Sequence, residues 1–571
     1  MKKNVLTLMA AVVLVSASLD SRAQGTSVKE LPKGWQLLDK DADGYYGLSM
    51  KKAYDFVKTK KSKTVIVAVI DSGVDTLHED LKEVLWTNPR EIPGNGIDDD
   101  KNGYIDDVHG WNFLGGKDGR NVKDDSYEGA RVYHQLKKIY GDKTTDSTSL
   151  TPEQKDQYKI WLKVKASIEG DASGNGVDQL LMQRALESSL EGDSVLRKAI
   201  GKETYTGKDL DKYTPVGADQ QKAKAFLLYM FKANNIMEST NKEYLDEFKE
   251  YVSGEQKKKE ALNTPPRDYR KEIVQDNEDD INDRYYGNND IMAGTPFHGT
   301  HVSGIIAAKR NNGKGIDGIA DNVKIMMIRA VPDGDEHDKD IALAIRYAVD
   351  NGARVVNMSF GKSFSPHKDW VDDAVKYAES KGVLLVHAAG NDAKNVDSTD
   401  NFPNPDFRLS TAVASNWVTV GASSDPLAEP RFKSYTASFS NYGKKEVNVF
   451  APGTRIYSSV PGGNTYGMAQ GTSMASPVVA GVAAFILSYY PDLSAEQVKY
   501  VIEKSAVVLP AKVKMPTPSS EDPDQARTVS LSDISTSGGV INAYQAVKLA
   551  STLKPEGRQN PSSSLKNKIN E

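Results

Sequence analysis

Apolar and polar positions follow two different periodicities in the C-terminal half of the chain. Residues 323–331 (VKIMMIRAV), 354–360 (RVVNMSF) and 383–391 (VLLVHAAGN) are short, nearly continuous apolar runs, which indicate buried strands. Between them lie residues 340–353 and 370–382, whose apolar positions recur at helical spacing. This alternation predicts a parallel sheet covered by helices, with ligand-binding groups at the carboxyl ends of the strands.

The middle of the chain, residues 119–285, shows a different pattern. It is rich in Lys, Glu, Asp and Gln, and its apolar positions recur at helical spacing. One predicted helix begins with a capping box from Thr151 to Gln154, with Pro152 at the first helical position. A second predicted helix, at residues 222–237, has a strong apolar face. We therefore expect a mainly helical segment here.

The N-terminus has the pattern of a targeting signal. Lys2 and Lys3 precede an apolar run at residues 5–17, and the small-residue pattern SRA precedes Gln24. We expect a signal peptide that directs export to the periplasm or the extracellular space, with an N-terminal anchor as the alternative. The longest later apolar run, residues 477–487, is too short to span a bilayer, so no transmembrane anchor is expected in the mature chain.

These patterns divide the chain into five segments. They are a signal peptide, the first part of the α/β region, a helical insertion, the rest of the α/β region and a polar tail, at residues 1–23, 24–118, 119–285, 286–551 and 552–571. The chain has 39% hydrophobic and 26% charged residues and a formal net charge of −5, which is typical of a globular protein and does not suggest a nucleic-acid partner. The absence of cysteine excludes disulfides and thiolate chemistry, and the scattered histidines do not predict a catalytic zinc.

Four chemically useful side chains lie at the ends of predicted elements. Asp71 ends an apolar run that begins at Thr64, and Asn391 ends another. His298 precedes an apolar helix, and Ser473 begins one. Each alone has a plain structural explanation as a cap, a turn residue or a buried histidine. Together they supply a nucleophile, a base, an orienting acid and an oxyanion donor, which are the groups that acyl transfer needs.

Five segments resemble the signature segments of the subtilases, the subtilisin-like serine peptidases. They are VAVIDSGVDTLHEDL, HGTHVSG, VVNMSFG, AAGND and GTSMASPVVAGVAA, at residues 67–81, 298–304, 355–361, 388–392 and 471–484. The order Asp71, His298, Ser473 is also the subtilase order, whereas chymotrypsin-like enzymes and α/β-hydrolases use other orders. The resemblance implies a subtilisin-like α/β fold with a parallel sheet flanked by helices.

The resemblance also implies roles for individual residues. Ser473 corresponds to the nucleophile, His298 to the general base, Asp71 to the acid that orients it and Asn391 to an oxyanion donor. Protein or peptide substrates are expected to bind extended, as an added strand, along two segments: Ser359, Phe360 and Gly361, and Ala388, Ala389 and Gly390. The implied activity is that of an exported serine endopeptidase. The alternative is a catalytically silent, calcium-stabilised binding protein on the same scaffold.

One feature departs from the compact members of that family. Asp71 and His298 are 227 positions apart, so the helical segment 119–285 is an insertion between two members of the expected triad. The insertion is either a solvated appendage without a catalytic role, or a lid or substrate-selecting domain.

The loop GNGIDDDKNGYIDDVHGWNF indicates a calcium site. Oxygen ligands recur at alternate positions, which suits Ca²⁺, and the candidate ligands are Asp98, Asp100, Asn102, Tyr104 through its carbonyl, and Asp106 or Asp107. His109 stands where an EF-hand has its closing glutamate, so this is not a full EF-hand. A solvated acidic turn is the alternative.

Overall fold

A computed structural model of the chain describes residues 31–141, 148–172, 176–233, 236–237, 239–294, 296–429, 432–518 and 523–555. The expected signal peptide, and all of the expected tail except residues 552–555, lie outside the described residues. The chain forms two compact units. We call them the helical unit, whose main part is Gly129–Pro266, and the sheet unit, which comprises Leu31–Glu128, Arg267–Thr517 and Ala526–Glu571.

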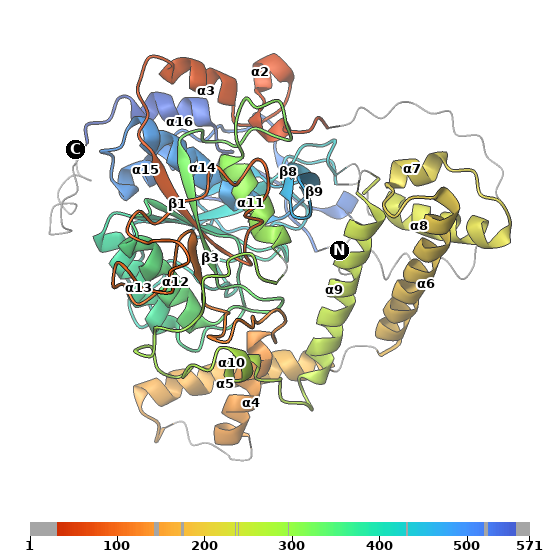
Figure 1. Ribbon diagram of the computed structural model, residues 1–571, viewed down its shortest axis with the longest axis horizontal. Coiled ribbons are helices and arrows are strands. Elements are labelled where there is room, and N and C mark those ends of the chain that lie inside the picture. The colour runs from red at the N-terminus through yellow and green to blue at the C-terminus, as the bar shows by residue number, and fades with distance from the viewer. Residues whose placement is uncertain are drawn as a thin grey trace. The chain divides into compact units, whose positions relative to one another are not determined.

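The sheet unit is built on seven parallel strands (Figure 1). They are β1 (Val65–Asp71), β2 (Gly110–Asn112), β3 (Val323–Arg329), β4 (Val355–Met358), β5 (Leu384–Ala388), β6 (Trp417–Ser423) and β7 (Val449–Pro452). Their order across the sheet is β2-β3-β1-β4-β5-β6-β7. In register, Val67 of β1 lies opposite Ile325 of β3 on one side and Val355 of β4 on the other. The predicted strand–helix series forms β3, α12, β4, α13 and β5, which confirms the parallel sheet flanked by helices.

Successive side chains along a strand point to opposite faces of the sheet, so the sheet unit has two hydrophobic cores. On β1, Val65, Val67 and Val69 join one core, while Ala68 and Ile70 join the other. Helices α11 (Phe297–Ala307) and α14 (Thr472–Tyr489) contribute to the first core, and α12 (Asp338–Asp350) and α13 (Lys368–Ser380) to the second. Both faces of the sheet are buried, which explains the nearly continuous apolar character of its strands.

Helix α14 is the most apolar helix of the sheet unit. Among the described residues it alone is long and apolar enough to cross a membrane, with a mean hydropathy of 1.5, but 89% of this stretch is buried inside the protein. It packs against β4, β5 and β6. The first residues of α14 therefore reach the carboxyl ends of the central strands.

The remaining elements of the sheet unit surround this core. They are the short helices η1 (Trp35–Leu37), α2 (Lys40–Asp43), α10 (Tyr269–Ile273) and η3 (Leu531–Asp533), the longer helices α3 (Met50–Val57), α15 (Ala495–Lys504) and α16 (Ala543–Ala550), and the two-stranded sheets β8 (Ile456–Val460) with β9 (Thr465–Ala469) and β10 (Val513–Lys514) with β11 (Thr528–Val529).

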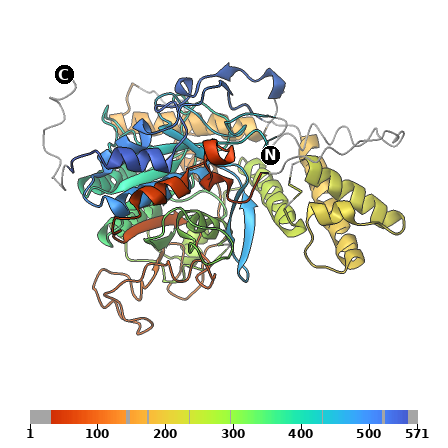
Figure 2. The same ribbon diagram turned by 90° about the horizontal axis from the view of Figure 1, so that it is seen from above.

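The helical unit has a core of its own, which includes Leu196, Phe231 and Phe248. Its helices are α5 (Pro152–Ala172), α6 (Gly176–Ile200), α7 (Gly207–Lys212), α8 (Ala218–Ala233) and α9 (Asn241–Glu260). The short helix η2 (Pro523–Gln525) also belongs to this unit. Helix α4 (Glu128–Tyr140) begins at Glu128, the last residue of the first sheet-unit segment. Helices α6 and α8 lie side by side (Figures 1 and 2). The predicted capping box is confirmed: Gln154 N donates to Thr151 Oγ1 at 3.3 Å and Thr151 N to Gln154 Oε1 at 3.0 Å.

Candidate active site

Asp71 and His298 meet at the carboxyl end of β1. Asp71 is 2% exposed, and its Oδ1 accepts a hydrogen bond from the backbone N–H of Ser72. His298 Nδ1, in the first turn of α11, lies 2.8 Å from Asp71 Oδ1 and 3.0 Å from Oδ2. An ionised carboxylate can only accept, so Nδ1 is the ring nitrogen that carries the donated proton.

This contact depends on the glycine that follows His298. A Cβ on Gly299 would lie 2.1 Å from the carbonyl oxygen of Gly73 and 3.1 Å from Asp71 Oδ1. Only glycine allows α11 to begin so close to the end of β1. His301, one turn later, is fully buried, and its Nε2 donates to the carbonyl of Ile456 at 3.0 Å. Burial lowers the pKa of His301 to about 3, so its ring is neutral.

Ser473 lies in the first turn of α14, and its Oγ donates to the carbonyl oxygen of Ser359 at 3.0 Å. Pro477 stands one turn further along and has no N–H for the Ser473 carbonyl. The Ser359 hydroxyl donates to that carbonyl instead, at 2.9 Å. The two serines thus exchange hydrogen bonds, which attaches the start of α14 to the segment after β4.

Asn391 and the backbone of Ser473 present two donors at one place. Asn391 Oδ1 accepts from Thr472 N at 2.8 Å and from Thr472 Oγ1 at 3.0 Å, so its Nδ2 is directed elsewhere. Asn391 Nδ2 and Ser473 N each lie 3.5 Å from the position that a Cβ on Gly471 would occupy. Within the described part of the chain, the Ser473 N–H has no acceptor. A negatively charged oxygen could therefore accept from both donors, at the start of a helix.

The two expected substrate segments extend from neighbouring strands. Ser359, Phe360 and Gly361 follow β4, and Ala388, Ala389 and Gly390 form the end of β5 and its continuation. Asn401 lies between the segments: its Nδ2 donates to the Ala389 carbonyl at 3.0 Å, and its Oδ1 lies 2.8 Å from the position of a Cβ on Gly361. His387 Nε2 donates to the Phe360 carbonyl at 2.8 Å. Burial lowers the pKa of His387 to about 4, so it too is neutral.

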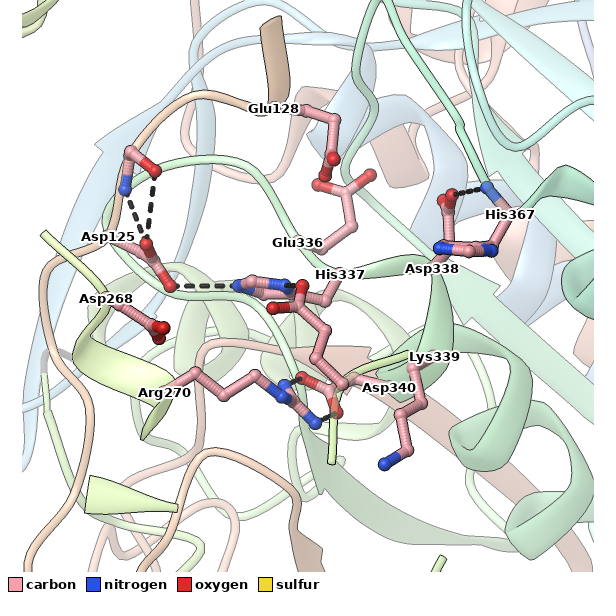
Figure 3. Close-up of polar contacts among 12 residues, drawn as sticks. Asp125, Glu128, Asp268, Arg270, Glu336, His337, Asp338, Lys339, Asp340 and His367 are labelled. Atoms are coloured by element: carbon pink, nitrogen blue, oxygen red, sulfur yellow. Dashed lines mark hydrogen bonds and ion pairs between the residues drawn. The ribbon is translucent and has the colours of Figure 1, made fainter. Parts of the chain in front are cut away.

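A buried group of charges borders the first of these segments (Figure 3). Lys362 follows Gly361, and its Nζ lies 3.0 Å from Glu128 Oε2, 2.8 Å from Asp338 Oδ1 and 2.8 Å from the Glu336 carbonyl. Figure 3 shows the carboxyl groups of Glu128 and Glu336 pointing toward each other. Burial raises the pKa of Glu336 to about 8, so its carboxyl group holds a proton at neutral pH.

His337 contacts two residues that flank the main part of the helical unit in the sequence, Asp125 before it and Glu278 after it. Its Nε2 lies 3.0 Å from Asp125 Oδ2 and its Nδ1 lies 2.5 Å from Glu278 Oε1. Both ring nitrogens of His337 thus lie within hydrogen-bond distance of a carboxylate. Nothing in the sequence pattern pointed to this group, because its members come from four separate stretches.

In the acidic loop, two predicted ligands lie beside a residue that the sequence analysis missed. Carboxylate oxygens of Glu91, Asp100 and Asp107 lie within 4.8 Å of one another, and this is the only such group of possible metal ligands among the described residues. Glu91 is 7% exposed, and its buried Oε2 has no hydrogen-bond partner in the described part of the chain. Asp107 is fully buried, which raises its pKa to about 6. Clustered carboxylates with an unsatisfied buried oxygen fit a Ca²⁺ ion.

The other predicted ligands shape the loop in the structure. Asp98 accepts from the backbone N–H groups of Asn102 and Gly103, at 3.0 and 2.8 Å. Asp106 accepts from three backbone N–H groups, those of Gly94, Asn95 and Gly96. The Asn102 side chain donates to Asp107 Oδ2 at 3.0 Å, and the Tyr104 ring packs against Trp111.

Comparison with known proteins gives consistent results. The profile of the Subtilase family matches residues 62–534. The chain is 44% identical over 192 residues to the Thermophilic serine proteinase of Bacillus sp. (strain AK1), a match that covers 34% of this chain and 42% of that protein. It is 38% identical over 214 residues to Subtilisin DY of Bacillus licheniformis, with 37% of this chain and 71% of that protein covered. It is also 38% identical over 210 residues to Thermitase of Thermoactinomyces vulgaris, with 37% and 67% covered.

Proposed function

Because the chain belongs to the subtilase family, we propose that it is an exported serine endopeptidase that cleaves peptide bonds through an acyl-enzyme with Asp71, His298 and Ser473 as its triad. The observation that carries this proposal is the 2.8 Å contact between His298 Nδ1 and Asp71, which fixes the tautomer that a general base needs. Export is supported by the N-terminal sequence pattern.

In the proposed reaction, Ser473 Oγ leaves the Ser359 carbonyl and attacks the carbonyl carbon of the scissile bond. His298 Nε2 takes the hydroxyl proton, and Asp71 stabilises the imidazolium that forms. The carbonyl oxygen becomes negatively charged and accepts from Asn391 Nδ2 and the Ser473 N–H. His298 then gives the proton to the leaving amine, and a water molecule releases the acyl group by the same steps in reverse.

We propose that the substrate binds as an extended strand along residues 359–361 and 388–390. The continuation of two neighbouring parallel strands supports this mode, because their backbones leave a strand-like edge at the carboxyl end of the sheet. Residues 24–118 and 286–551 are assigned to the peptidase domain. Residues 119–285 are assigned to an insertion that includes the Gly129–Pro266 part of the helical unit.

We also propose a structural Ca²⁺ ion in the acidic loop, held by Glu91, Asp100 and Asp107. The ion would neutralise carboxylates that are otherwise close together and partly buried. Asp98 and Asp106 support the site by ordering the loop backbone, and Asn102 orients Asp107. The ion supplies stability to the loop and takes no part in the chemistry.

A fluorophosphonate probe tests the proposed activity. The purified chain is expected to react at one serine, and Ser473→Ala is expected to abolish the labelling. Ser488→Ala, at the far end of α14, is a matched control that keeps it, because Ser488 Oγ donates to the Phe485 carbonyl of its own helix. No labelling of the unmodified, folded chain would favour a catalytically silent binding protein instead.

A further inference from the structure

The turn that carries Asn391 has an irregular backbone. Gly390 and Ala393 on either side of it both have positive φ angles, of 99° and 54°. Alanine rarely adopts such a conformation, so the turn must be held by its surroundings. Its shape matters, because the position of Asn391 Nδ2 follows from the path of residues 389–394.

The side chain of Asn441 holds this turn from three directions. Its Oδ1 accepts from the backbone N–H groups of Asp392 and Lys394, at 3.0 and 2.8 Å. Its Nδ2 donates to the carbonyl of Ala389 at 2.8 Å. In addition, the backbone N–H of Asn441 donates to the carbonyl of Gly390 at 2.8 Å. Asn441 therefore binds backbone groups on both sides of Asn391.

Asn441 is buried and closely packed against the turn. It is 3% exposed, and a Cβ on Gly390 would lie 2.4 Å from its Nδ2. Its backbone is fixed in turn, since Ser440 Oγ donates to the Asn441 carbonyl and accepts from Ala422 N of strand β6. This chain of contacts connects the turn to the centre of the sheet.

We propose that Asn441 is a positioning residue for catalysis, which holds the turn at residues 389–394 so that Asn391 Nδ2 can donate to the oxyanion. It acts through Asn391. The inference rests on the proposed function, because it assigns a role to a residue only if Asn391 stabilises a transition state.

An asparagine is well suited to this position. Two backbone N–H groups need an acceptor with two lone pairs, and a carbonyl needs a donor, on the same short side chain. Aspartate provides the acceptor but places a carboxylate oxygen against the Ala389 carbonyl. Alanine provides neither, so the N–H groups of Asp392 and Lys394 lose this acceptor and the Ala389 carbonyl keeps only the bond from Asn401.

The test compares steady-state kinetics of Asn441→Ala and Asn441→Asp with the unmodified protein. Asn441→Ala is expected to lower kcat by about 10- to 100-fold, as small displacements of a catalytic group do, with KM changed less than about threefold. Asn441→Asp is expected to lie in between. If Asn441→Ala does not fold, Asn441→Asp, which keeps both bonds to N–H groups, carries the test alone.

A double-mutant cycle separates positioning from general stability. In an Asn391→Ala background, Asn441→Ala or Asn441→Asp is expected to lower kcat less than about threefold further, because the group being positioned is already gone. Asn448→Ala is the matched control. Asn448 is a buried amide between the same two strands, β6 and β7, that bonds to Thr419 N and Glu503 and not to the turn, and its loss is expected to lower stability without lowering kcat.

Additive losses in the cycle, or an unchanged kcat in the folded single variants, would overturn the inference. Failure of the proposed function looks different. If Ser473→Ala hydrolyses peptides as well as the unmodified chain does, the active-site assignment itself is wrong. If Ser473→Ala is inactive and the folded Asn441 variants keep full kcat, the error is confined to Asn441.

Discussion

The Ser359 hydroxyl donates a 2.9 Å hydrogen bond to the carbonyl oxygen of Ser473, and the Ser473 hydroxyl donates a 3.0 Å bond to the carbonyl oxygen of Ser359. The first bond replaces the helical bond that Pro477 cannot make. The residue proposed as the nucleophile is thus fixed by a contact with the strand end beside which the substrate is proposed to bind.

Replacement of Ser359 tests the energetic part of this relationship. Ser359→Ala is expected to lower the free energy of unfolding by about 1–3 kcal/mol, because the carbonyl of Ser473 then lacks its partner in a largely buried place. Chemical denaturation measures the change. Ser488→Ala is the control. It is expected to lower the free energy of unfolding less, because the Phe485 carbonyl that loses the Ser488 hydroxyl remains within helix α14. Equal effects in the two variants would contradict the explanation.

The triad itself makes the strongest prediction. Ser473→Ala is expected to abolish peptide hydrolysis and to leave the unfolding transition intact, because its hydroxyl is the group that we propose forms the acyl-enzyme. Turnover of a fluorogenic peptide by the purified variant is the measurement. Full activity in this variant would refute the assignment of the nucleophile.

Asn391→Leu tests the oxyanion donor. We expect kcat to fall by about 10²–10³, the loss typical when one such donor is removed from a subtilisin-type site, with KM little changed. Asn395→Ala in the same loop is the control, because the Asn395 side chain accepts from the N–H of Asp397. A rise in KM at constant kcat would instead make Asn391 a contact to the bound substrate.

The calcium proposal predicts a thermal effect. Calcium that binds only the folded state stabilises it by about 2.7 kcal/mol at a hundredfold excess over Kd, so the melting temperature is expected to fall in chelator and to recover with Ca²⁺ better than with Mg²⁺. Glu91→Gln is expected to remove most of this response while it preserves the shape of the side chain. If the unmodified chain melts at the same temperature in chelator and in millimolar calcium, the loop binds no ion.

Glu336 predicts a dependence of stability on pH. Its pKa is raised by burial to about 8 from an ordinary value of 4.5, so between these values the folded state holds a proton that the unfolded state has lost. This group therefore makes the free energy of unfolding fall as pH rises from about 4.5 to about 8. Glu336→Gln removes the titration, and its unfolding free energy is expected to decline less across this range. Parallel curves for the two proteins would show that Glu336 does not titrate there.

The strands and helices of the fold could be predicted from the sequence because the spacing of apolar residues indicates which faces of an element are buried. The runs that became β3, β4 and β5 are continuous, and both faces of the sheet are covered. The capping box at Thr151 is equally local, since all its groups lie within four residues.

The supporting residues of the site could not be predicted in this way. Asn441 lies about 50 positions after the turn that it holds, and Glu91 precedes the acidic loop without matching its spacing. Asparagine and glutamate are mostly found on protein surfaces, so neither residue stands out in the sequence as part of a site. Only the three-dimensional contacts, and the unsatisfied oxygen of Glu91, distinguish them.

The separation of Asp71 from His298 by 227 positions also affects how the protein is made. Strand β1 leaves the ribosome early, but both of its neighbours in the sheet, β3 and β4, are synthesised only after the Gly129–Pro266 part of the helical unit. Such a topology has a high contact order, which slows folding. Asp71 and His298 cannot meet until the chain from β1 to α11 has been translated, so a newly made molecule forms this contact only after the whole intervening segment has been synthesised.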